Sequence, residues 1–260
     1  PLFGGLSPEP IEKNLKALVQ AVQENKAAIG LAVDGDGDRL GVVDDKGRYL
    51  PPHHVFPLIL QHLIENRKMK GKVVQTVSLG YLSERIAKKH GVELIEVPVG
   101  FKYVVDKMRQ TKVFWGGEES GGYGCGLWAW ERDGLLSGLL LLEAVMAKHQ
   151  PLSVLREKLE AEYGKSFFLR NDYAMKNPIA DKTAWAETLS HKLPAKLADT
   201  KIRELKRLDG LKIVLEDDSW LLLRPSGTEP LLRTYAESPS PEKTKQLLTK
   251  AQEIATIKTS

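Results

Sequence analysis

Residues 73–115 read VVQTVSLGYLSERIAKKHGVELIEVPVGFKYVVDKMRQTKVFW, and this stretch decides the fold class. Short apolar segments predict strands at 73–77, 93–97 and 112–115. The spacing of apolar residues predicts helices at 83–90 and 102–110. Strands that alternate with helices are typical of a layered α/β domain with a parallel sheet.

The sequence on the N-terminal side extends this pattern. Ser7-Pro8-Glu9 predicts a helix start, because a serine N-cap, a proline and an acidic residue favour a first helical turn. A strand is expected at 29–33, a hairpin between 40 and 50, and a helix at 54–65.

The sequence on the C-terminal side first predicts two helices, 134–149 and 152–163, with Asp133 as the N-cap of the first. A third block follows, in which strands outnumber helices. Its expected elements are a strand at 166–173, a helix at 182–191, strands at 201–208, 211–215, 220–224 and 231–236, and a helix from Pro241. The expected fold is therefore α/β over 1–52 and 53–164, followed by a small α+β domain at 165–260.

Composition excludes several classes of protein. The 260 residues are 42% hydrophobic and 28% charged, which is typical of a globular chain. The net charge is only +4 and the basic residues are dispersed, so we expect no nucleic-acid partner. No apolar run is long enough to span a membrane, and Cys125 is the single cysteine, which fits a reducing cytoplasm. The oligomeric state is left open, and a chain that opens at Pro1 suggests a fragment.

One loop carries three carboxylates directly after the apolar strand 29–33. It reads Asp34-Gly35-Asp36-Gly37-Asp38-Arg39, and its glycines allow a tight turn that directs the side chains toward one centre. Three hard oxygen ligands suit Mg²⁺ or Ca²⁺. An EF-hand is rejected, because the sixth and twelfth positions hold Arg39 and Asp45. A solvated acidic turn remains the alternative.

A second loop, Gly116-Gly117-Glu118-Glu119-Ser120-Gly121-Gly122, follows the strand 112–115. Its small residues allow a ligand to approach the backbone. Glu118 and Ser120 could hydrogen-bond sugar hydroxyls, because a carboxylate accepts and a hydroxyl donates or accepts. The alternative is a flexible turn.

A third loop reads Arg224-Pro225-Ser226-Gly227-Thr228-Glu229-Pro230, with Arg233 on the next strand. Two guanidinium groups, two hydroxyls and a glycine backbone are groups that can surround a phosphate. The alternative is a hairpin with incidental arginines.

These loops, in this order, resemble those of the α-D-phosphohexomutase family, which includes phosphoglucomutase and phosphomannomutase. The resemblance covers nearly the whole chain and also rests on Pro1-Leu2-Phe3-Gly4-Gly5, Pro8-Glu9-Pro10 and Val99-Gly100-Phe101-Lys102-Tyr103. Family members have four domains around a cleft. The resemblance implies that 1–52 is the C-terminal part of the second domain, 53–164 the third domain and 165–260 the fourth.

The resemblance also implies roles for individual residues. Asp34, Asp36 and Asp38 would hold Mg²⁺. Arg39 would lie near the transferring phosphoryl group, and Lys102 would contact the substrate and take part in proton transfer.

Two further sets of contacts come from the same resemblance. Glu118 and Ser120 would contact sugar hydroxyls. The phosphate that is not reacting would be held by Arg224, Ser226, Gly227, Thr228 and Arg233.

The implied activity is that of a phosphoglucomutase, which interconverts glucose 1-phosphate and glucose 6-phosphate. In the family a phosphoserine donates its phosphoryl group, and glucose 1,6-bisphosphate is the intermediate. The sequence has no Ser-His-Asn-Pro type loop, so this chain is expected to be inactive alone. Phosphomannomutases often carry Met and His where this chain has Glu119 and Gly122, which favours glucose.

Three alternatives stay open. The chain could be part of a phosphomannomutase or phosphoglucosamine mutase. It could be a non-catalytic module that binds sugar phosphates. A Mg²⁺-dependent phosphatase with Asp34 as nucleophile is the least favoured, because the spacing of the aspartates does not match that class.

Overall fold

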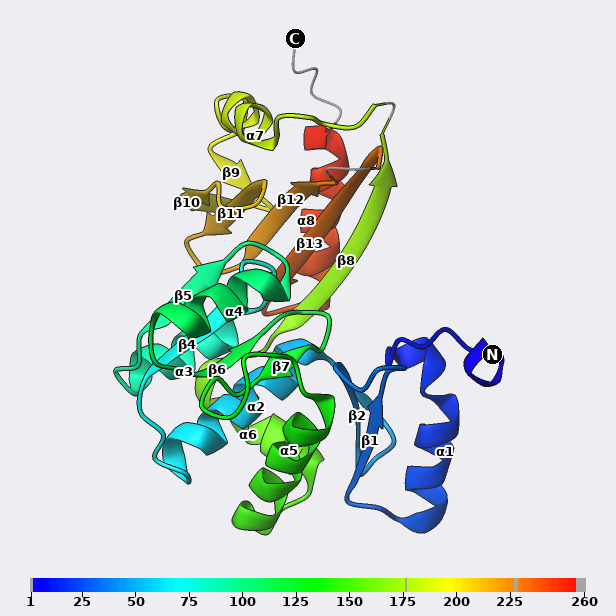
Figure 1. Cartoon of the computed structure of the whole chain (residues 1–260). Coiled ribbons are helices and arrows are strands. Elements are labelled where there is room, and N and C mark those ends of the chain that lie inside the picture. The colour runs from blue at the N-terminus through cyan, green and yellow to red at the C-terminus, as the bar shows by residue number, and fades with distance from the viewer. Residues whose placement is uncertain (1, 176, 227–228, 256–260) are drawn as a thin grey trace. The chain divides into compact units, whose positions relative to one another are not determined.

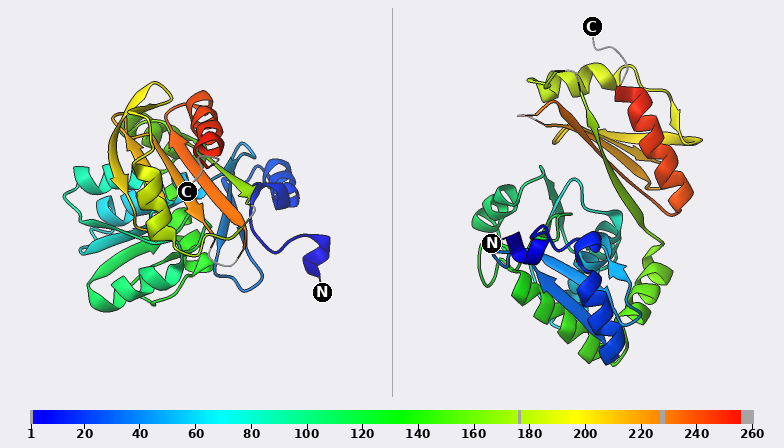
Figure 2. Two further views of the ribbon diagram at one scale, coloured as in Figure 1. Left: turned by 90° about the horizontal axis from the view of Figure 1, so that it is seen from above. Right: turned by 90° about the vertical axis from the view of Figure 1, so that its right-hand side faces the viewer.

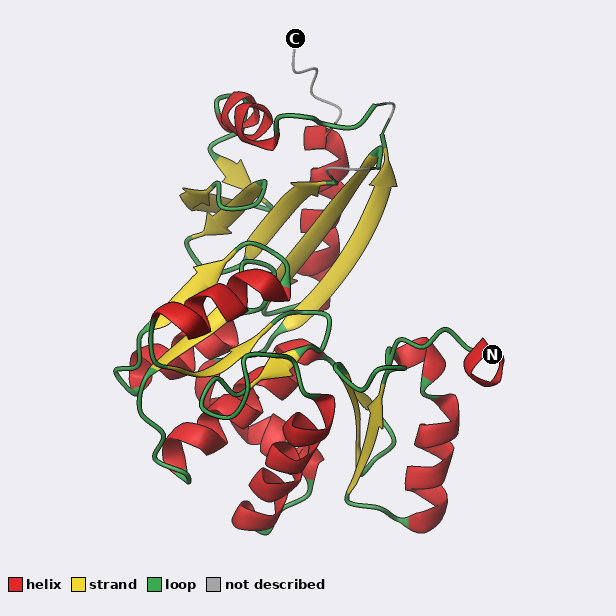
Figure 3. Cartoon of the chain, viewed as in Figure 1, coloured by secondary structure: helices red, strands yellow, loops and turns green. Residues whose placement is uncertain are grey.

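The computed structural model describes residues 2–175, 177–226 and 229–255, and it divides into two compact units, 1–164 and 165–260. Figure 1 labels the elements, and Figure 3 colours them by type. The elements of the first unit are η1 (Leu2–Gly5), η2 (Glu12–Asn14), α1 (Lys16–Asn25), β1 (Ile29–Val33), β2 (Leu40–Asp44), β3 (Tyr49–Leu50), α2 (Pro52–Glu65), β4 (Lys72–Thr76), α3 (Tyr81–Lys89), β5 (Leu94–Val97), α4 (Phe101–Gln110), β6 (Val113–Gly117), β7 (Tyr123–Gly124), α5 (Gly134–Lys148) and α6 (Leu152–Tyr163).

The first unit begins with a small antiparallel sheet in the order β1-β2-β3. Helices α1 and α5 cover its two faces (Figure 1). Gly30 lies against Leu18 of α1, whereas Leu31 points the other way and reaches Gly138 of α5. This alternation follows from the two-residue period of a strand.

The predicted helix start at Ser7 is wrong. The first helical turn after Ser7 is the short 3-10 element η2, and α1 begins only at Lys16. Ser7 precedes Pro8 and Glu9 precedes Pro10, and a residue before proline is disfavoured in the helical region. The Asn14 side chain instead donates to the carbonyl oxygen of Glu9, at 2.8 Å, and stabilises an irregular segment.

The four-stranded sheet of the first unit has the order β5-β4-β6-β7. Strands β5, β4 and β6 are parallel, and β7 is antiparallel to β6. Helix α4 packs on one face through Val104 and Met108. Helix α2 packs on the other, where Phe56 stacks on Trp115 of β6 with ring centroids 5.6 Å apart. The sheet therefore brings the carboxyl ends of β4 and β6 to one edge, where ligands bind in open α/β sheets.

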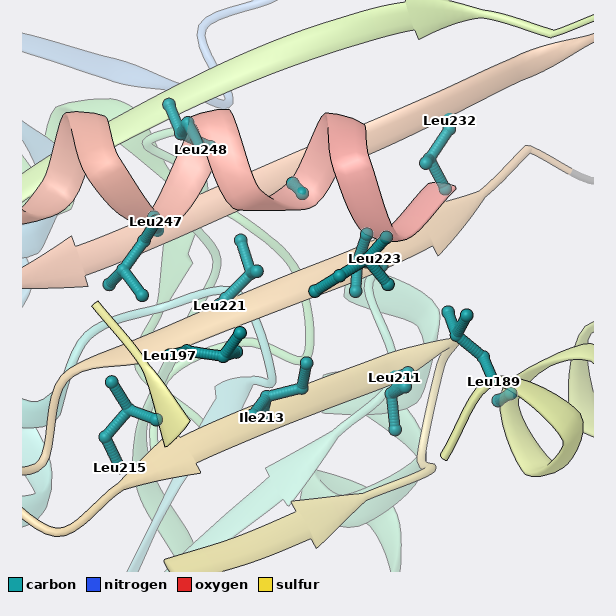
Figure 4. Close-up of a cluster of buried hydrophobic side chains, with 14 of the residues drawn as sticks. Leu189, Leu197, Leu211, Ile213, Leu215, Leu221, Leu223, Leu232, Leu247 and Leu248 are labelled. Atoms are coloured by element: carbon teal, nitrogen blue, oxygen red, sulfur yellow. The ribbon is translucent and has the colours of Figure 1, made fainter. Parts of the chain in front are cut away.

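The second unit is an antiparallel sheet with helices on one face, as the views in Figure 2 also show. The strand order is β8-β13-β12-β11-β10-β9. Leucines and isoleucines of the strands meet Trp185 of α7 and Leu247 of α8 in one buried cluster (Figure 4). The elements are β8 (Phe167–Ala174), α7 (Lys182–Ser190), β9 (Lys196–Leu197), β10 (Thr200–Lys206), β11 (Leu211–Leu215), β12 (Trp220–Pro225), β13 (Leu231–Ser238) and α8 (Pro241–Ala255).

The predicted fold class is confirmed: α/β layers come first and a small α+β domain follows. The predicted N-cap of α5 is also confirmed, because Asp133 accepts a hydrogen bond from the backbone N–H of Leu136 at 2.8 Å. Within the described part of the chain, every helix is too short or too polar to cross a membrane.

Candidate functional site

The loop between β1 and β2 gathers its three carboxylates. Oxygen atoms of Asp34, Asp36 and Asp38 all lie within 4.8 Å of one another. Asp34 is buried, and its Oδ1 accepts the backbone N–H groups of Asp38 and Arg39 at 2.9 and 3.1 Å. The loop is also tied to α5, because the N–H of Gly134 donates to the carbonyl oxygen of Gly37 at 3.0 Å. Backbone contacts thus preorganise the predicted metal loop.

Burial and charged neighbours shift the pKa values of Asp34 and Asp38 in opposite directions. Burial raises the pKa of Asp34, but hydrogen bonds from the Arg39 backbone and guanidinium outweigh that effect and leave the pKa lowered. Burial also raises the pKa of Asp38, and the charges of Asp34 and Asp36 raise it further against the opposing effect of Arg132. Three carboxylates with two guanidinium neighbours form a donor set that fits a hard divalent cation.

The second loop leaves the carboxyl end of β6 and meets the metal loop. The backbone N–H of Leu40 donates to the carbonyl oxygen of Gly121 at 2.9 Å, and Arg39 and Gly122 form an isolated β-bridge. Gly121 has φ = +90°, and a Cβ there would lie 2.7 Å from the Leu40 carbonyl oxygen. A glycine is therefore required where the two loops touch.

Glu118 is the central side chain of the second loop. Its Oε1 accepts the Ser120 hydroxyl at 2.6 Å, and its Oε2 is buried without a hydrogen-bond partner in the described part of the chain. Burial raises the pKa of Glu118, and the charge of Glu119 adds to the rise, while Ser120 and Arg132 oppose it. An unsatisfied buried oxygen is costly, so it marks a position where a ligand group would be stabilised.

Arg132 joins the two loops and is not among the residues that the sequence predicted for the site. Its guanidinium forms an ion pair with Asp38 through Nη2 and contacts Glu118 Oε1 through Nη1 at 3.4 Å. The residue directly precedes Asp133, the N-cap of α5, so the start of that helix fixes its backbone. The sequence does hold one indication of this role, because Arg132 directly precedes a predicted helix N-cap and follows the glycine-rich loop.

Glu119 forms hydrogen bonds with different residues from those that Glu118 contacts. Its Oε2 accepts the hydroxyls of Ser78 and Thr76, the latter at 3.2 Å. Those residues lie at the carboxyl end of β4 and just beyond it. The loop begins at the end of β6, and Glu119 also ties it to the end of the neighbouring strand β4.

Lys102 lies in the first turn of α4 with an exposed side chain. Its Nζ sits 4.9 Å from the centre of the Tyr103 ring. Neither the metal loop nor the glycine-rich loop contacts it through a recorded hydrogen bond or ion pair within the described residues. Its predicted role in proton transfer stays a prediction.

The predicted phosphate residues lie in the second unit. Arg224 of β12 and Arg233 of β13 are directly opposite each other, so their side chains share one face of the sheet. Arg224 Nε donates to Asp209 Oδ2 at 2.6 Å, and Arg233 Nη2 donates to Glu229 Oε2 at 3.5 Å. Arg233 Nε is buried without a hydrogen-bond partner among the described residues.

Ser226 directly follows β12. This serine is buried, and its Oγ accepts the backbone N–H of Glu229 at 3.2 Å. Gly227 and Thr228, also predicted to bind phosphate, lie outside the described residues. Two like charges placed side by side are unfavourable unless an anion or acidic side chains offset them, and Asp209 and Glu229 provide that offset here. The predicted role of these residues in binding phosphate stays a prediction.

Family models match most of the chain. The phosphoglucomutase/phosphomannomutase family is matched by its alpha/beta/alpha domain II at residues 1–47, alpha/beta/alpha domain III at 51–163 and C-terminal domain at 181–254. The chain therefore belongs to the phosphoglucomutase/phosphomannomutase, or α-D-phosphohexomutase, family.

Individual relatives agree with this assignment. A Thermococcus gammatolerans protein, provisionally named phosphoglucosamine mutase, is 34% identical over 247 residues, which is 95% of this chain and 52% of the relative. A Thermus thermophilus structure, provisionally named phosphomannomutase, has a TM-score of 0.80 and 32% identity over 98% of this chain and 52% of its own. The chain thus spans about half the length of these relatives.

A more distant structure shares the fold. The N-acetylphosphoglucosamine mutase of Aspergillus fumigatus, solved in complex with GlcNAc-6P and magnesium, has a TM-score of 0.55 and 19% identity. The match covers 86% of this chain and 51% of that structure.

Proposed function

We propose that this chain is the metal-, sugar- and phosphate-binding part of a phosphohexomutase that acts on glucose phosphates. The observation that carries the proposal is the joined pair of loops in the first unit. Asp38 of the metal loop and Glu118 of the glycine-rich loop share the guanidinium of Arg132. A cation site and a hydroxyl-binding site next to each other suit a phosphorylated sugar.

The proposed roles follow from the chemistry of each group. Asp34, Asp36 and Asp38 would hold Mg²⁺, which offsets the negative charge of a transferring phosphoryl group when it is bound. Arg39, held against Asp34 at 2.5 Å, would present its remaining N–H groups to that phosphoryl group. Glu118 and Ser120 would orient the sugar through its hydroxyls.

The paired arginines of the second unit would hold the other phosphate. A guanidinium donates two parallel hydrogen bonds to a phosphate, so Arg224 and Arg233 would fix it from one face of the sheet. A mutase of this kind moves a phosphoryl group between two carbons of the sugar, so the sugar must bind in two opposite orientations. The phosphate that is not reacting must be held at the same site in both.

The chain alone is proposed to lack turnover. Its sequence has no Ser-His-Asn-Pro type loop that would supply the phosphoserine, and a bisphosphate sugar could not form without that donor. Loss of a covalent nucleophile lowers kcat by many orders of magnitude. Sustained conversion of glucose 1-phosphate by the pure chain would contradict this proposal.

Calorimetric titration with glucose 1-phosphate, with and without Mg²⁺, tests the binding roles. Ser120→Ala and Arg224→Ala should each weaken binding about tenfold, because each loses hydrogen bonds worth about 1–2 kcal/mol. Ser190→Ala and Arg207→Ala, whose side chains pair with each other at the far end of α7, should bind as the wild type does. Wild-type binding that survives both site substitutions would overturn the assignment.

A second candidate substrate is a glucosamine phosphate. It is favoured by the 34% identical relative, which carries the name phosphoglucosamine mutase. The same titration with glucosamine 1-phosphate and mannose 1-phosphate decides which of the three sugar phosphates is preferred. The sugar that binds at least tenfold more tightly than the others is the one that the loop containing Glu118 selects.

A further inference from the structure

The guanidinium of Arg132 has more hydrogen-bonding capacity than its neighbours use. Its Nη2 pairs with Asp38, and its Nη1 lies 3.4 Å from Glu118 Oε1. Its Nε is buried without a hydrogen-bond partner among the described residues, and Glu131 Oε1 is 3.9 Å from it. A buried donor without a partner is costly, so this position of the guanidinium leaves one of its donors unsatisfied.

The backbone of Arg132 is fixed, whereas its side chain has room to turn. The N–H of the next residue, Asp133, donates to the carbonyl oxygen of Tyr123 at 2.8 Å. A Cβ at Gly122 would lie 2.4 Å from Arg132 Cδ, so the side chain passes close over the glycine-rich loop. The centre of the Phe101 ring is 5.7 Å from the guanidinium carbon. Rotation of the side chain alone can therefore shift the guanidinium between its two carboxylate partners.

Asp38 is the partner that also belongs to the candidate metal site. Its carboxylate oxygens lie within 4.8 Å of those of Asp34 and Asp36. The Asp38 side chain is only 16% exposed, and the guanidinium of Arg132 lies against it. A guanidinium and a divalent cation at one carboxylate repel each other, so full contact of both with Asp38 is unfavourable.

Glu118 is the partner that can receive the guanidinium. Its side chain is buried, and its Oε2 has no hydrogen-bond partner in the part of the chain that the structure describes. The planar fork of an arginine matches the two oxygens of a carboxylate. Each of these oxygens has two lone pairs, so Glu118 can accept a guanidinium and still accept a sugar hydroxyl.

We infer that Arg132 competes with a divalent cation for Asp38, and that the displaced guanidinium is held by Glu118. Arg132 is then a positioning residue that couples cation binding in the metal loop to the orientation of Glu118. The inference rests on the proposed metal and sugar sites and adds a coupling between them. Its consequence is that the cation and the sugar phosphate favour each other's binding.

The sign of a change in Mg²⁺ affinity tests the competition. In calorimetric titration with Mg²⁺ alone, Arg132→Gln should bind about tenfold more tightly than the wild type, because a positive charge beside Asp38 is lost. Arg132→Lys keeps the charge and should bind as the wild type does. A side chain that only supports the loop would give weaker binding when replaced. Unchanged or weaker binding by Arg132→Gln would overturn the inference.

Two controls separate this result from other causes. Arg67→Gln removes another arginine of the first unit, which pairs with Glu143, and should leave the Mg²⁺ affinity within about twofold of the wild type. An equal gain in affinity there would overturn the inference, because net charge alone would explain it. Asp38→Asn should weaken Mg²⁺ binding at least tenfold. Wild-type binding by Asp38→Asn would contradict the proposed metal site itself, and the inference with it.

A double-mutant cycle tests the move to Glu118, again with Mg²⁺ as the probe. Glu118→Gln should weaken Mg²⁺ binding about fivefold, because Arg132 loses its other carboxylate and stays at Asp38. In the Arg132→Gln background the same substitution should change the affinity less than twofold. Equal effects of Glu118→Gln in the two backgrounds would overturn this step.

Titration with glucose 1-phosphate measures the coupling between the two sites. Saturating Mg²⁺ should tighten its binding at least fivefold in the wild type and less than twofold in Arg132→Gln. The same factor in both proteins would overturn the coupling. Absence of glucose 1-phosphate binding by the wild type would contradict the proposed substrate but not the competition at Asp38, which the titrations with Mg²⁺ alone decide.

Discussion

At the scale of single residues, Arg132 determines how the two loops of the first unit are connected. It faces Asp38 on one side and Glu118 on the other, and its side chain is 29% exposed. A guanidinium can serve two carboxylates at once because its donors form a fixed planar fork. A single side chain therefore couples the metal loop to the loop that is predicted to bind sugar.

Replacing Arg132 with Ala should lower the free energy of unfolding by about 1–2 kcal/mol, because the buried Glu118 loses a charged neighbour. Saturating Mg²⁺ should restore part of the loss, because a cation near Asp38 replaces the missing charge. Urea unfolding with and without Mg²⁺ measures both effects.

The control for this prediction is Arg170→Ala, which removes an exposed arginine that pairs with Asp172. It should change the unfolding free energy by less than about 0.5 kcal/mol. Equal effects of the two substitutions would contradict the role given to Arg132.

At the scale of elements, the turn between β2 and β3 caps α6. Asp45 accepts the backbone N–H of Ser153 at 2.8 Å and its hydroxyl at 3.0 Å. The carboxylate lies at the N-terminus of the helix, where unpaired N–H groups and the helix dipole favour negative charge. This contact fixes the small sheet to the helical layer of the four-stranded sheet.

Asp45→Ala should reduce stability by about 1–2 kcal/mol, the usual cost of losing an N-cap. Ser153→Ala should cost less, because it keeps the backbone N–H that Asp45 binds. Chemical denaturation of the two variants and the double variant measures the coupling between them. Additive effects would show that the Ser153 hydroxyl is not coupled to Asp45. An Asp45→Ala variant as stable as the wild type would show that the cap contributes little.

Helices α2 and α6 are joined by a buried histidine. His54 Nε2 lies 2.9 Å from Glu160 Oε1, and Arg156 also contacts that glutamate. Burial lowers the pKa of His54, and the charge of Arg156 lowers it further, against the raising effect of Glu160. The folded protein therefore binds a proton here less readily than the unfolded chain does.

Stability should consequently fall as the pH drops below about 6.5, the ordinary pKa of histidine, because the unfolded chain takes up the proton first. His54→Gln should flatten the dependence between pH 8 and pH 5.5, since glutamine can still donate to Glu160 and does not titrate. Urea midpoints across this range give the measurement. A wild-type midpoint that rises as the pH falls would contradict the sign.

At the scale of the whole molecule, the second unit has its own core. Buried side chains of α7, α8 and the strands β9, β11, β12 and β13 meet in one apolar cluster, and none of the described residues of 1–164 belongs to it (Figure 4). A unit with a complete core is expected to fold alone.

Residues 165–260, produced alone, should therefore unfold cooperatively by calorimetry, with an enthalpy of about 60–80 kcal/mol near 60 °C. Broad unfolding without a heat-absorption peak would show that the unit depends on 1–164. The cooperative fragment would also allow the paired arginines to be titrated with phosphate in isolation.

Local patterns in the sequence predicted much of the fold. The alternation over residues 73–115, the cap at Asp133 and the strands of the second unit follow from short-range spacing, which a single sequence displays. The short strands β7 and β9 were not predicted, because two residues carry no periodicity. The helix start at Ser7 was wrongly predicted, because its N-cap signal competes with two nearby prolines.

Adjacent residues alone show which loops carry carboxylates, hydroxyls and arginines, because each of these groups belongs to a short run of the chain. The folded chain was needed to show that Asp38 and Glu118, 80 positions apart, share Arg132, and that Arg224 lies opposite Arg233. The structure also revealed that one flank of α5 is exposed. The apolar residues of this helix follow one another closely, so the sequence does not tell which of them are buried. Contacts between distant segments depend on how layers pack, and no local pattern encodes that packing.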